Sequence, residues 1–406
     1  MARYGLPDTV AFCSRCVISN QRPNSVIEYR NVAEAEKKTI HFDDEGVCDA
    51  CRVAEAKRGI DWQQREGELN DLCNRFRNRS GDYDCIVPGS GGKDSFYTGH
   101  ILQTRFGMHP LFVTWAPHIY TDWGRRNLER WQEIASHVLY TPRRSVHRLL
   151  TRLALENLFH PFQPFMIGQK ALAPKLAVLH NIPLVFYGEN EAEYGNPKED
   201  SQTARRHYGY YAQQPKDIHL AGCSLDDLRR VHGLHSCDLE PYLPALPESL
   251  NRVGVEVHYL GYYLKWHPQS CYYYAVENGG FECSPHRTPG TYSKYSSIDD
   301  KCDDWHYLTT YYKFGIGRAT YDAAQEIRSG DITRDEGVAL VKRFDGEWPE
   351  RFERDMNEYL SVGGFAPMTR ERWWMLIEKF KSPHLFDANN KLKHAVWEST
   401  PNFGGK

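Results

Sequence analysis

A glycine-rich stretch, Ser90-Gly91-Gly92-Lys93-Asp94-Ser95, combines residue types that bind phosphate groups. Glycines let a phosphate approach backbone N–H groups closely, and the N-terminus of a following helix attracts the same anion. Lys93 adds a positive charge, the hydroxyls of Ser90 and Ser95 add donors, and Asp94 is a candidate ligand for the magnesium ion of a polyphosphate. We therefore predict a phosphate-binding loop in which Lys93, Asp94 and Ser95 are catalytic.

Two common phosphate-binding motifs do not fit this stretch. A Walker A loop needs a glycine five places before Gly92 and Ser or Thr after Lys93, but these positions hold Val87 and Asp94. The dinucleotide fingerprint fails because Asp94 stands where its third glycine belongs. An ordinary glycine turn between a strand and a helix is the alternative without a function.

Short apolar runs alternate with helical patterns from Tyr83 onward, which predicts an α/β fold with a parallel sheet. Ligands bind at the carboxyl ends of such strands, so Thr114 and Gly188-Glu189-Asn190 are expected to bind the cofactor together with the loop. Glu189 is a second candidate ligand for magnesium, and a solvated acidic loop is the alternative. The predicted strands are 84–87, 110–115, 137–140, 182–187 and 255–266, and the predicted helices are 54–79, 94–106, 123–136 and 145–180, the last interrupted at Pro161, Pro164 and Pro174.

Two cysteine pairs, Cys13/Cys16 and Cys48/Cys51, have the spacing of zinc knuckles. Each pair can bend round one tetrahedral ion, and the metal would stabilise a segment too small to bury a core. Four thiolates leave no open coordination position. The pattern therefore predicts a structural zinc ribbon rather than a catalytic metal.

The length of 406 residues predicts two or three domains, and the formal net charge of −3 gives no global attraction to nucleic acid. No apolar run reaches the ~20 residues of a membrane span. We expect a cytoplasmic protein with a zinc ribbon and connecting helix at 1–80, a nucleotide-binding α/β domain at 81–268 and a mainly helical region at 269–406. A polar region near 196–251 is predicted to be an insertion in the second domain.

The loop Ser90–Ser95 resembles the SGGxDS loop of the PP-loop ATP pyrophosphatases, whose fold is of the adenine nucleotide alpha hydrolase-like type. Together with the cysteine pairs and four further stretches, it makes the chain resemble, almost from end to end, the N-acetyl sugar amidotransferases of bacterial surface-sugar synthesis. The other matching stretches are 160–165, 186–190, 290–297 and 313–320.

This resemblance implies ATP, Mg²⁺ and structural Zn²⁺ as cofactors. It also implies conversion of an acetamido group on a sugar, for example a nucleotide-linked sugar of lipopolysaccharide O-antigen, into an acetamidino group. Ammonia would come from a separate glutaminase with a barrel-like partner, resembling the pair of histidine biosynthesis. The candidate contacts for an anionic sugar, each of which could equally be a surface charge or an ion pair, are Gln169, Lys170, Lys294, Lys313 and Arg318.

Two other functions compete with this interpretation. A PP-loop tRNA thiolase would need a catalytic cysteine, for which Cys271, Cys283 and Cys302 are the candidates outside the ribbon. The mildly acidic charge balance argues against a tRNA substrate. A zinc-ribbon adaptor that binds ATP without turnover is the second alternative. Such an adaptor would not need both a phosphate-binding loop and metal-binding carboxylates.

Overall fold

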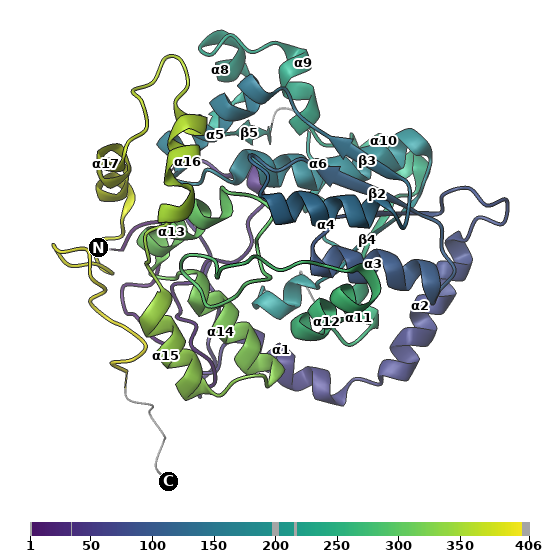
Figure 1. Ribbon diagram of the computed structural model, residues 1–406, viewed down its shortest axis with the longest axis horizontal. Helices are drawn as coiled ribbons and strands as arrows, with labels where there is room; N and C mark the ends of the chain where they lie inside the picture. The colour runs from purple at the N-terminus through teal and green to yellow at the C-terminus, as the bar shows by residue number, and fades with distance from the viewer. Residues whose placement is uncertain (1, 34, 197–202, 215–216, 400–406) are drawn as a thin grey trace.

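The computed structural model describes residues 2–33, 35–196, 203–214 and 217–399. A five-stranded parallel sheet lies at its centre in the order β3-β2-β1-β4-β7 (Figure 1). Its strands are β1 (Cys85–Pro88), β2 (Pro110–Trp115), β3 (His137–Tyr140), β4 (Leu184–Tyr187) and β7 (Glu256–Tyr259). The predicted parallel α/β fold is confirmed. The order changes direction between β1 and β4, and a ligand site is expected at such a switch point.

Successive side chains along each strand point to opposite faces of the sheet, as the pleat requires. Ile86 and Val185 pack with α5 (Arg144–Leu158) and α6 (Gln163–His180). Val87 and neighbouring side chains pack on the other face with α3 (Lys93–Thr104), α4 (Asp122–Gln132) and α12 (Pro268–Gly279). Both faces are covered, which explains why the strands are continuous apolar runs.

Three predicted elements differ from the structure. The strand expected at 255–266 ends at Tyr259, where the Gly261 N–H donates to the Gly188 carbonyl at 2.8 Å and the chain turns into α11 (Leu260–Tyr263). The stretch 145–180 divides at Phe159, which has φ +48°, and α6 continues through Pro174. The helix expected at 54–79 is α1 (Asp49–Ala56), a 3₁₀ turn and α2 (Trp62–Phe76).

The C-terminal third is helical, as predicted. It contains α13 (Asp303–Phe314), α14 (Arg318–Ser329), α15 (Arg334–Phe344), α16 (Glu353–Leu360) and α17 (Arg370–Phe380). Thr333 begins α15 with a capping box to Glu336. The cysteine-rich N-terminal segment packs against Ala323 of α14 and Val341 of α15, so the two ends of the chain share an apolar cluster.

The region 196–251 includes 197–202 and 215–216, which lie outside the described residues, so its predicted role as an insertion stays a prediction. Its described part holds the short pair β5 (His219–Leu220) and β6 (Cys223–Ser224) and the helices α8 (Leu225–Arg230), α9 (Ser236–Leu239) and α10 (Pro247–Val253). No helix within the described ranges is long and apolar enough to span a membrane.

Two helical glycines offer a matched test of the packing around the sheet. A Cβ on Gly168 in α6 would lie 2.3 Å from the Trp115 ring, whereas one on the exposed Gly67 in α2 would meet nothing within 4 Å. Gly168→Ala should lower the free energy of unfolding by about 1–3 kcal/mol because the core is overpacked. Gly67→Ala should raise it by about 0.5–1 kcal/mol through helix propensity. Urea denaturation measures both, and equal effects of the two variants would contradict this packing.

Candidate functional site

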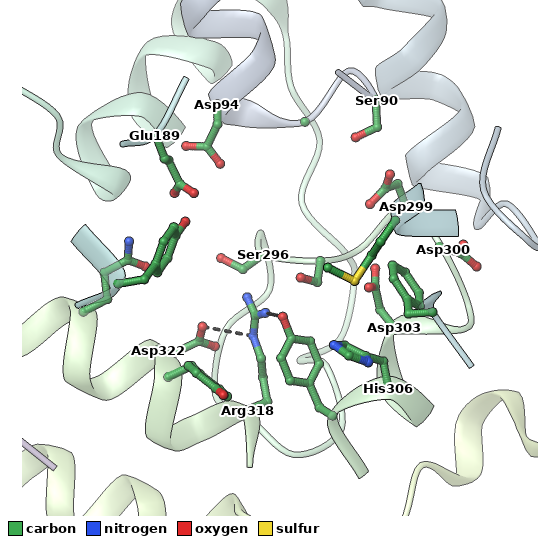
Figure 2. A pocket seen from close by; sticks show the side chains of 18 of the residues that line it. Ser90, Asp94, Glu189, Ser296, Asp299, Asp300, Asp303, His306, Arg318 and Asp322 are labelled. Carbon is green, nitrogen blue, oxygen red and sulfur yellow. Dashed lines mark hydrogen bonds and ion pairs between the residues drawn. The ribbon is translucent and has the colours of Figure 1, made fainter. Parts of the chain in front are cut away.

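A cavity of about 640 Å³ opens at the carboxyl ends of β1 and β4. The glycine-rich loop contributes Gly89, Ser90, Gly92, Lys93 and Asp94 to its lining. Figure 2 shows Asp94 and Glu189 near one another on one side, Ser90 pointing toward Asp299, and Arg318 reaching in from α14. Segments far apart in the sequence therefore converge on one space.

The glycines of the loop have different roles. A Cβ on Gly89 would lie 2.1 Å from Cβ of Ser95, and one on Gly91, which has φ +81°, would lie 2.7 Å from the Asn127 carbonyl oxygen. These two glycines let the loop pack against α3 and α4. A Cβ on Gly92 would meet only the Ser90 hydroxyl, at 3.6 Å. Gly92, at the N-terminus of α3, is thus the glycine that leaves room for a ligand.

Lys93 is the buried cation of the loop and is only 5% exposed. Its Nζ lies 2.6 Å and 2.7 Å from the two carboxylate oxygens of Asp94. Burial by itself lowers the pKa of Lys93, but Asp94 and Glu189 outweigh this effect and raise the pKa above its usual range. Lys93 is therefore held in its charged form.

Glu189, directly after β4, is the second carboxylate beside this lysine. Burial and the nearby charge of Asp94 raise the pKa of Glu189 to about 7, although Lys93 lowers it in part. Two carboxylates that share one cation leave an excess of negative charge. A divalent cation with oxygen ligands would compensate that charge, so the donor set fits Mg²⁺.

The other residues predicted to bind the cofactor surround the loop without lining the cavity. The Thr114 hydroxyl donates to the Gly89 carbonyl at 2.5 Å, and the Ser95 hydroxyl donates to the Gly92 carbonyl at 3.0 Å. Asn190 accepts a hydrogen bond from the Ala192 N–H at 3.0 Å. The Gly188 carbonyl is tied to Gly261. These groups hold the ends of β1, β2 and β4 in place.

A second acidic wall faces the loop and was not assigned from the sequence. Burial and the charge of Asp300 raise the pKa of Asp299 to about 6, while a hydrogen bond from Ser90 lowers it. Asp300 itself lies 2.7 Å from Nδ1 of the buried His118. Asp303 lines the same wall. The signal that could have identified this wall was the occurrence of Asp299 and Asp300 within a hydroxyl-rich stretch, 292–301, with Asp303 directly beyond it.

The structure places the five predicted sugar contacts in different surroundings. Gln169, Lys170 and Arg318 line the main cavity, and Arg318 lies 3.0 Å from Asp322 and also bonds to the Tyr307 hydroxyl. Lys313 lines a neighbouring cavity of about 210 Å³, where its Nζ donates to the Leu158 carbonyl at 2.8 Å. Burial lowers the pKa of Lys313 to about 7. Lys294 is exposed, bonds to the Pro285 carbonyl and lines neither cavity.

Cys13, Cys16, Cys48 and Cys51 form a buried cluster whose four sulfur atoms lie within 4.8 Å of one another. The Sγ atoms of Cys13 and Cys51 are 3.9 Å apart, and those of Cys16 and Cys48 are 3.8 Å apart. Tetrahedral Zn–S bonds of about 2.3 Å place sulfurs about 3.8 Å apart, whereas a disulfide would place them at about 2.05 Å. The cluster could therefore hold a zinc ion, as predicted.

The remaining candidate thiols are not placed for chemistry in the cavity. Cys271 and Cys302 are buried, and burial raises the pKa of both. Cys283 is half-buried. Among the residues that the structure describes, no cysteine lines the main cavity.

The carboxyl group of Glu189 should make stability depend on pH. It stays protonated in the folded protein up to about pH 7 but ionises near pH 4.5 when unfolded, so the ligand-free protein should lose stability as pH rises between these values. Glu189→Gln removes this loss. The variant should therefore gain more stability over the wild type at pH 8 than at pH 4.5. Urea denaturation in EDTA measures this difference, and an equal gain at both pH values would contradict the assignment.

Removal of one cysteine should release the zinc. The wild-type chain is expected to contain about one zinc per chain, and Cys48→Ser should lose it and unfold at a lower temperature because the metal holds the segment together. Cys237→Ser, which changes an exposed cysteine outside the cluster, is the control. Metal analysis by mass spectrometry gives the result. A wild-type protein without zinc would disprove the assignment.

Comparisons with known proteins relate parts of the chain to other proteins. Residues 289–400 match the family model of the C-terminal domain of WbpG-like LPS biosynthesis proteins. The chain is also 29% identical over 77 residues to an uncharacterized protein, MJ1599, of Methanocaldococcus jannaschii. That similarity covers 19% of this chain and 27% of the archaeal protein. The match at 289–400 includes the acidic wall and Arg318, so this part of the candidate site lies in a region that is similar to a lipopolysaccharide biosynthesis domain.

Proposed function

We propose that this protein is an ATP-dependent amidotransferase that converts an acetamido group of a bacterial surface sugar into an acetamidino group. The observation that carries the proposal is the arrangement of Lys93, Asp94 and Glu189 around Gly92 at the end of β1. A cavity of about 640 Å³ falls in the range of ~300–1,000 Å³ typical of ligand sites. The match to a lipopolysaccharide biosynthesis domain supports a sugar as the second substrate.

The reaction consists of two displacements. The amide oxygen first attacks the α-phosphorus of ATP, which forms an O–P bond, releases pyrophosphate and transfers the amide proton to a base. The resulting O-adenylyl imidate carries AMP as a leaving group. Ammonia then adds to the imidate carbon, AMP leaves with the former amide oxygen, and an amidine remains. The net change is replacement of the carbonyl oxygen by nitrogen at the expense of one ATP.

The residues of the loop have distinct roles in this scheme. The Gly92 N–H and the N-terminus of α3 would bind the pyrophosphate portion of ATP. Lys93 would neutralise the charge that develops on this leaving group, an effect worth several kcal/mol at a preorganised site. Asp94 and Glu189 would hold Mg²⁺, which supplies further charge neutralisation when bound.

Ammonia has to be supplied by another protein. The stretch Leu220-Ala221-Gly222-Cys223-Ser224 is not a nucleophile elbow. The Cys223 sulfur also accepts a hydrogen bond from the Asn157 side-chain amide at 3.3 Å, and burial and the charge of Asp227 raise the pKa of Cys223. We therefore propose a glutaminase subunit and a barrel-like partner that delivers ammonia.

The competing functions have less support. A thiolase would need a thiol at the reaction centre, and no cysteine lines the described part of the cavity. An adaptor that only binds ATP would gain nothing from a second carboxylate whose pKa is raised to about 7 beside Lys93. Neither alternative accounts for the match to a lipopolysaccharide biosynthesis domain.

Substitutions in the loop test the proposed chemistry. With ammonium chloride and a diacetamido sugar, Lys93→Ala and Asp94→Ala should lose most AMP formation, by a factor of about 10² or more, because the leaving group is no longer stabilised. The exposed Lys294→Ala is the control. Chromatography measures AMP, and mass spectrometry identifies the product by the replacement of O by NH.

The same assay examines the nitrogen donor. Glutamine should replace ammonium only when the glutaminase partner is present. Wild-type AMP formation in both loop variants would refute their roles, and glutamine-dependent turnover by the chain alone would refute the need for a partner.

A further inference from the structure

The main cavity is lined by more carboxylates than the phosphate loop and one magnesium ion account for. Those that the structure describes in the lining are Asp94, Glu189, Glu191, Asp299, Asp300, Asp303 and Asp322. Asp94 and Glu189 share Lys93. Glu191 lies 2.8 Å from Arg206. Cations of the protein therefore compensate these three carboxylates.

Two further carboxylates of the lining use their oxygens within the protein. Asp322 lies 3.0 Å from Arg318. Asp300 accepts hydrogen bonds from the backbone N–H groups of His118 and Cys302, at 2.7 Å and 2.9 Å, and it also lies 2.7 Å from Nδ1 of His118. Asp300 therefore fixes the wall of the cavity and has little acceptor capacity left for a substrate.

Asp299 and Asp303 remain without an ion pair. Asp303 begins α13, is 8% exposed and makes no side-chain hydrogen bond or ion pair with the described residues. Arg318 attracts it from beyond ion-pair distance, but the larger effects of Asp299 and Asp300 oppose that attraction. Asp299 accepts a hydrogen bond from Ser90, and no described arginine or lysine lies within ion-pair distance of it. Two neighbouring carboxyl groups without an ion-pair partner thus face the cavity.

The surroundings of Asp299 fix it next to the phosphate loop. Its backbone carbonyl accepts a hydrogen bond from the Thr121 N–H at 3.1 Å. A Cβ on Gly124, in the first turn of α4, would lie 2.5 Å from Cα of Asp299, so the helix packs directly on this residue. The hydrogen bond from Ser90 ties the side chain to the loop. Asp299 is therefore held where a molecule bound beside the loop would meet it.

Figure 2 shows Asp299 and Asp303 on the side of the cavity away from Asp94 and Glu189. A group between these two sides can meet ATP on one side and a carboxylate on the other. The proposed reaction needs this arrangement, because the amide oxygen attacks ATP while the amide nitrogen gives its proton to a base. The loop does not supply that base, since Lys93 is charged and its two carboxylates are assigned to Mg²⁺.

We propose that Asp299 is the catalytic base that accepts the amide proton of the sugar substrate. This inference rests on the proposed function and adds to it a catalytic residue from the wall opposite the metal-binding carboxylates. The amide N–H becomes strongly acidic only as the oxygen bonds to phosphorus, so a carboxylate is basic enough to remove its proton at that stage.

The proton is accounted for in both displacements. In the first, the O–P bond forms, the bond to pyrophosphate breaks, and the N–H electron pair becomes the C=N bond as the proton passes to Asp299. In the second, ammonia adds to the carbon and Asp299 returns the proton to the imidate nitrogen. Asp299 then takes one proton from the added nitrogen, whose lone pair expels AMP. Loss of this proton to solvent restores the carboxylate.

The acidity of the two carboxyl groups suits this role. Burial and the charge of Asp300 raise the pKa of Asp299 to about 6, so Asp299 is ionised at neutral pH but accepts a proton readily. Burial and the charge of Asp299 raise the pKa of Asp303 well above its usual range. Neighbouring carboxyl groups whose pKa values are pushed apart are typical of acid–base sites.

Substitution of Asp299 tests the assignment. With ATP, Mg²⁺, ammonium chloride and a diacetamido sugar, Asp299→Asn should lower kcat for AMP formation by a factor of about 10²–10⁴, which is the usual contribution of a general base. Isothermal titration should show that the variant binds a non-hydrolysable ATP analogue like the wild type. Asp335→Asn, which changes an exposed carboxylate of α15, is the control and should keep the wild-type kcat.

A small carboxylate distinguishes a missing base from a damaged site. Formate can occupy the space that Asp299→Ala leaves, so added formate should raise the kcat of this variant by a factor of about 10 or more. Lys93→Ala should not respond to formate, because it lacks a charge on the leaving-group side.

The stability of the ligand-free protein tests the pair of carboxyl groups without turnover. In EDTA at pH 8, Asp303→Asn should raise the urea midpoint, because it removes one of two neighbouring carboxyl groups that repel each other when ionised. Asp335→Asn should change the midpoint less. A lower midpoint for Asp303→Asn would contradict an uncompensated pair.

Wild-type AMP formation by Asp299→Asn would overturn the assignment of the base and leave the proposed amidotransferase in place. So would an inactive Asp299→Ala that does not respond to formate, and this variant decides if Asp299→Asn does not fold. A wild-type protein that forms no AMP would refute the proposed function itself, and the role of Asp299 as its base would fall with it.

Discussion

Charged side chains from distant parts of the chain are removed from bulk water around a single cavity, and the cost of this desolvation governs their arrangement. Lys93 is kept charged by Asp94 and Glu189, whereas burial and the nearby charge of Asp94 raise the pKa of Glu189 to about 7. The pKa of Asp299 is raised to about 6 for the same reason, because this carboxyl is buried next to another carboxylate, Asp300. The cavity thus has a side lined by carboxylates, and the cations Lys170 and Arg318 line it as well.

The parallel sheet sets where these charges meet. The ends of β1 and β4 bring the phosphate loop beside Glu189, and the close contact of Gly89 with Ser95 and of Gly91 with α4 fixes the loop against two helices. The N-terminal segment completes the cavity from outside the sheet. A zinc ion at the four cysteines would hold that segment together, and with it Arg22, which lines the cavity, so a structural metal would contribute indirectly to the site.

Much of this arrangement could be predicted from the sequence because it depends on local patterns. Four strands follow from apolar runs, the loop from its glycines and charges, and the cysteine cluster from its spacing. Helix ends were less predictable: Pro174 stays inside α6, and Phe159 rather than a proline divides 145–180 with a left-handed backbone. The acidic wall was missed because its role depends on tertiary burial, which spacing does not encode. Lys313 and Lys294 look equivalent to Lys170 in the sequence, and only packing separates them.

The most direct test of the account follows the oxygen atom of the amide. The substrate sugar is prepared with a heavy-oxygen label in its acetamido carbonyl, and the products of turnover with ATP and ammonium are analysed by mass spectrometry. Adenylylation of the amide oxygen predicts that the label appears in the phosphate of AMP and that pyrophosphate is unlabelled. Label in inorganic phosphate or pyrophosphate, or label retained in the sugar with unlabelled AMP, would contradict the central claim that the oxygen leaves with AMP.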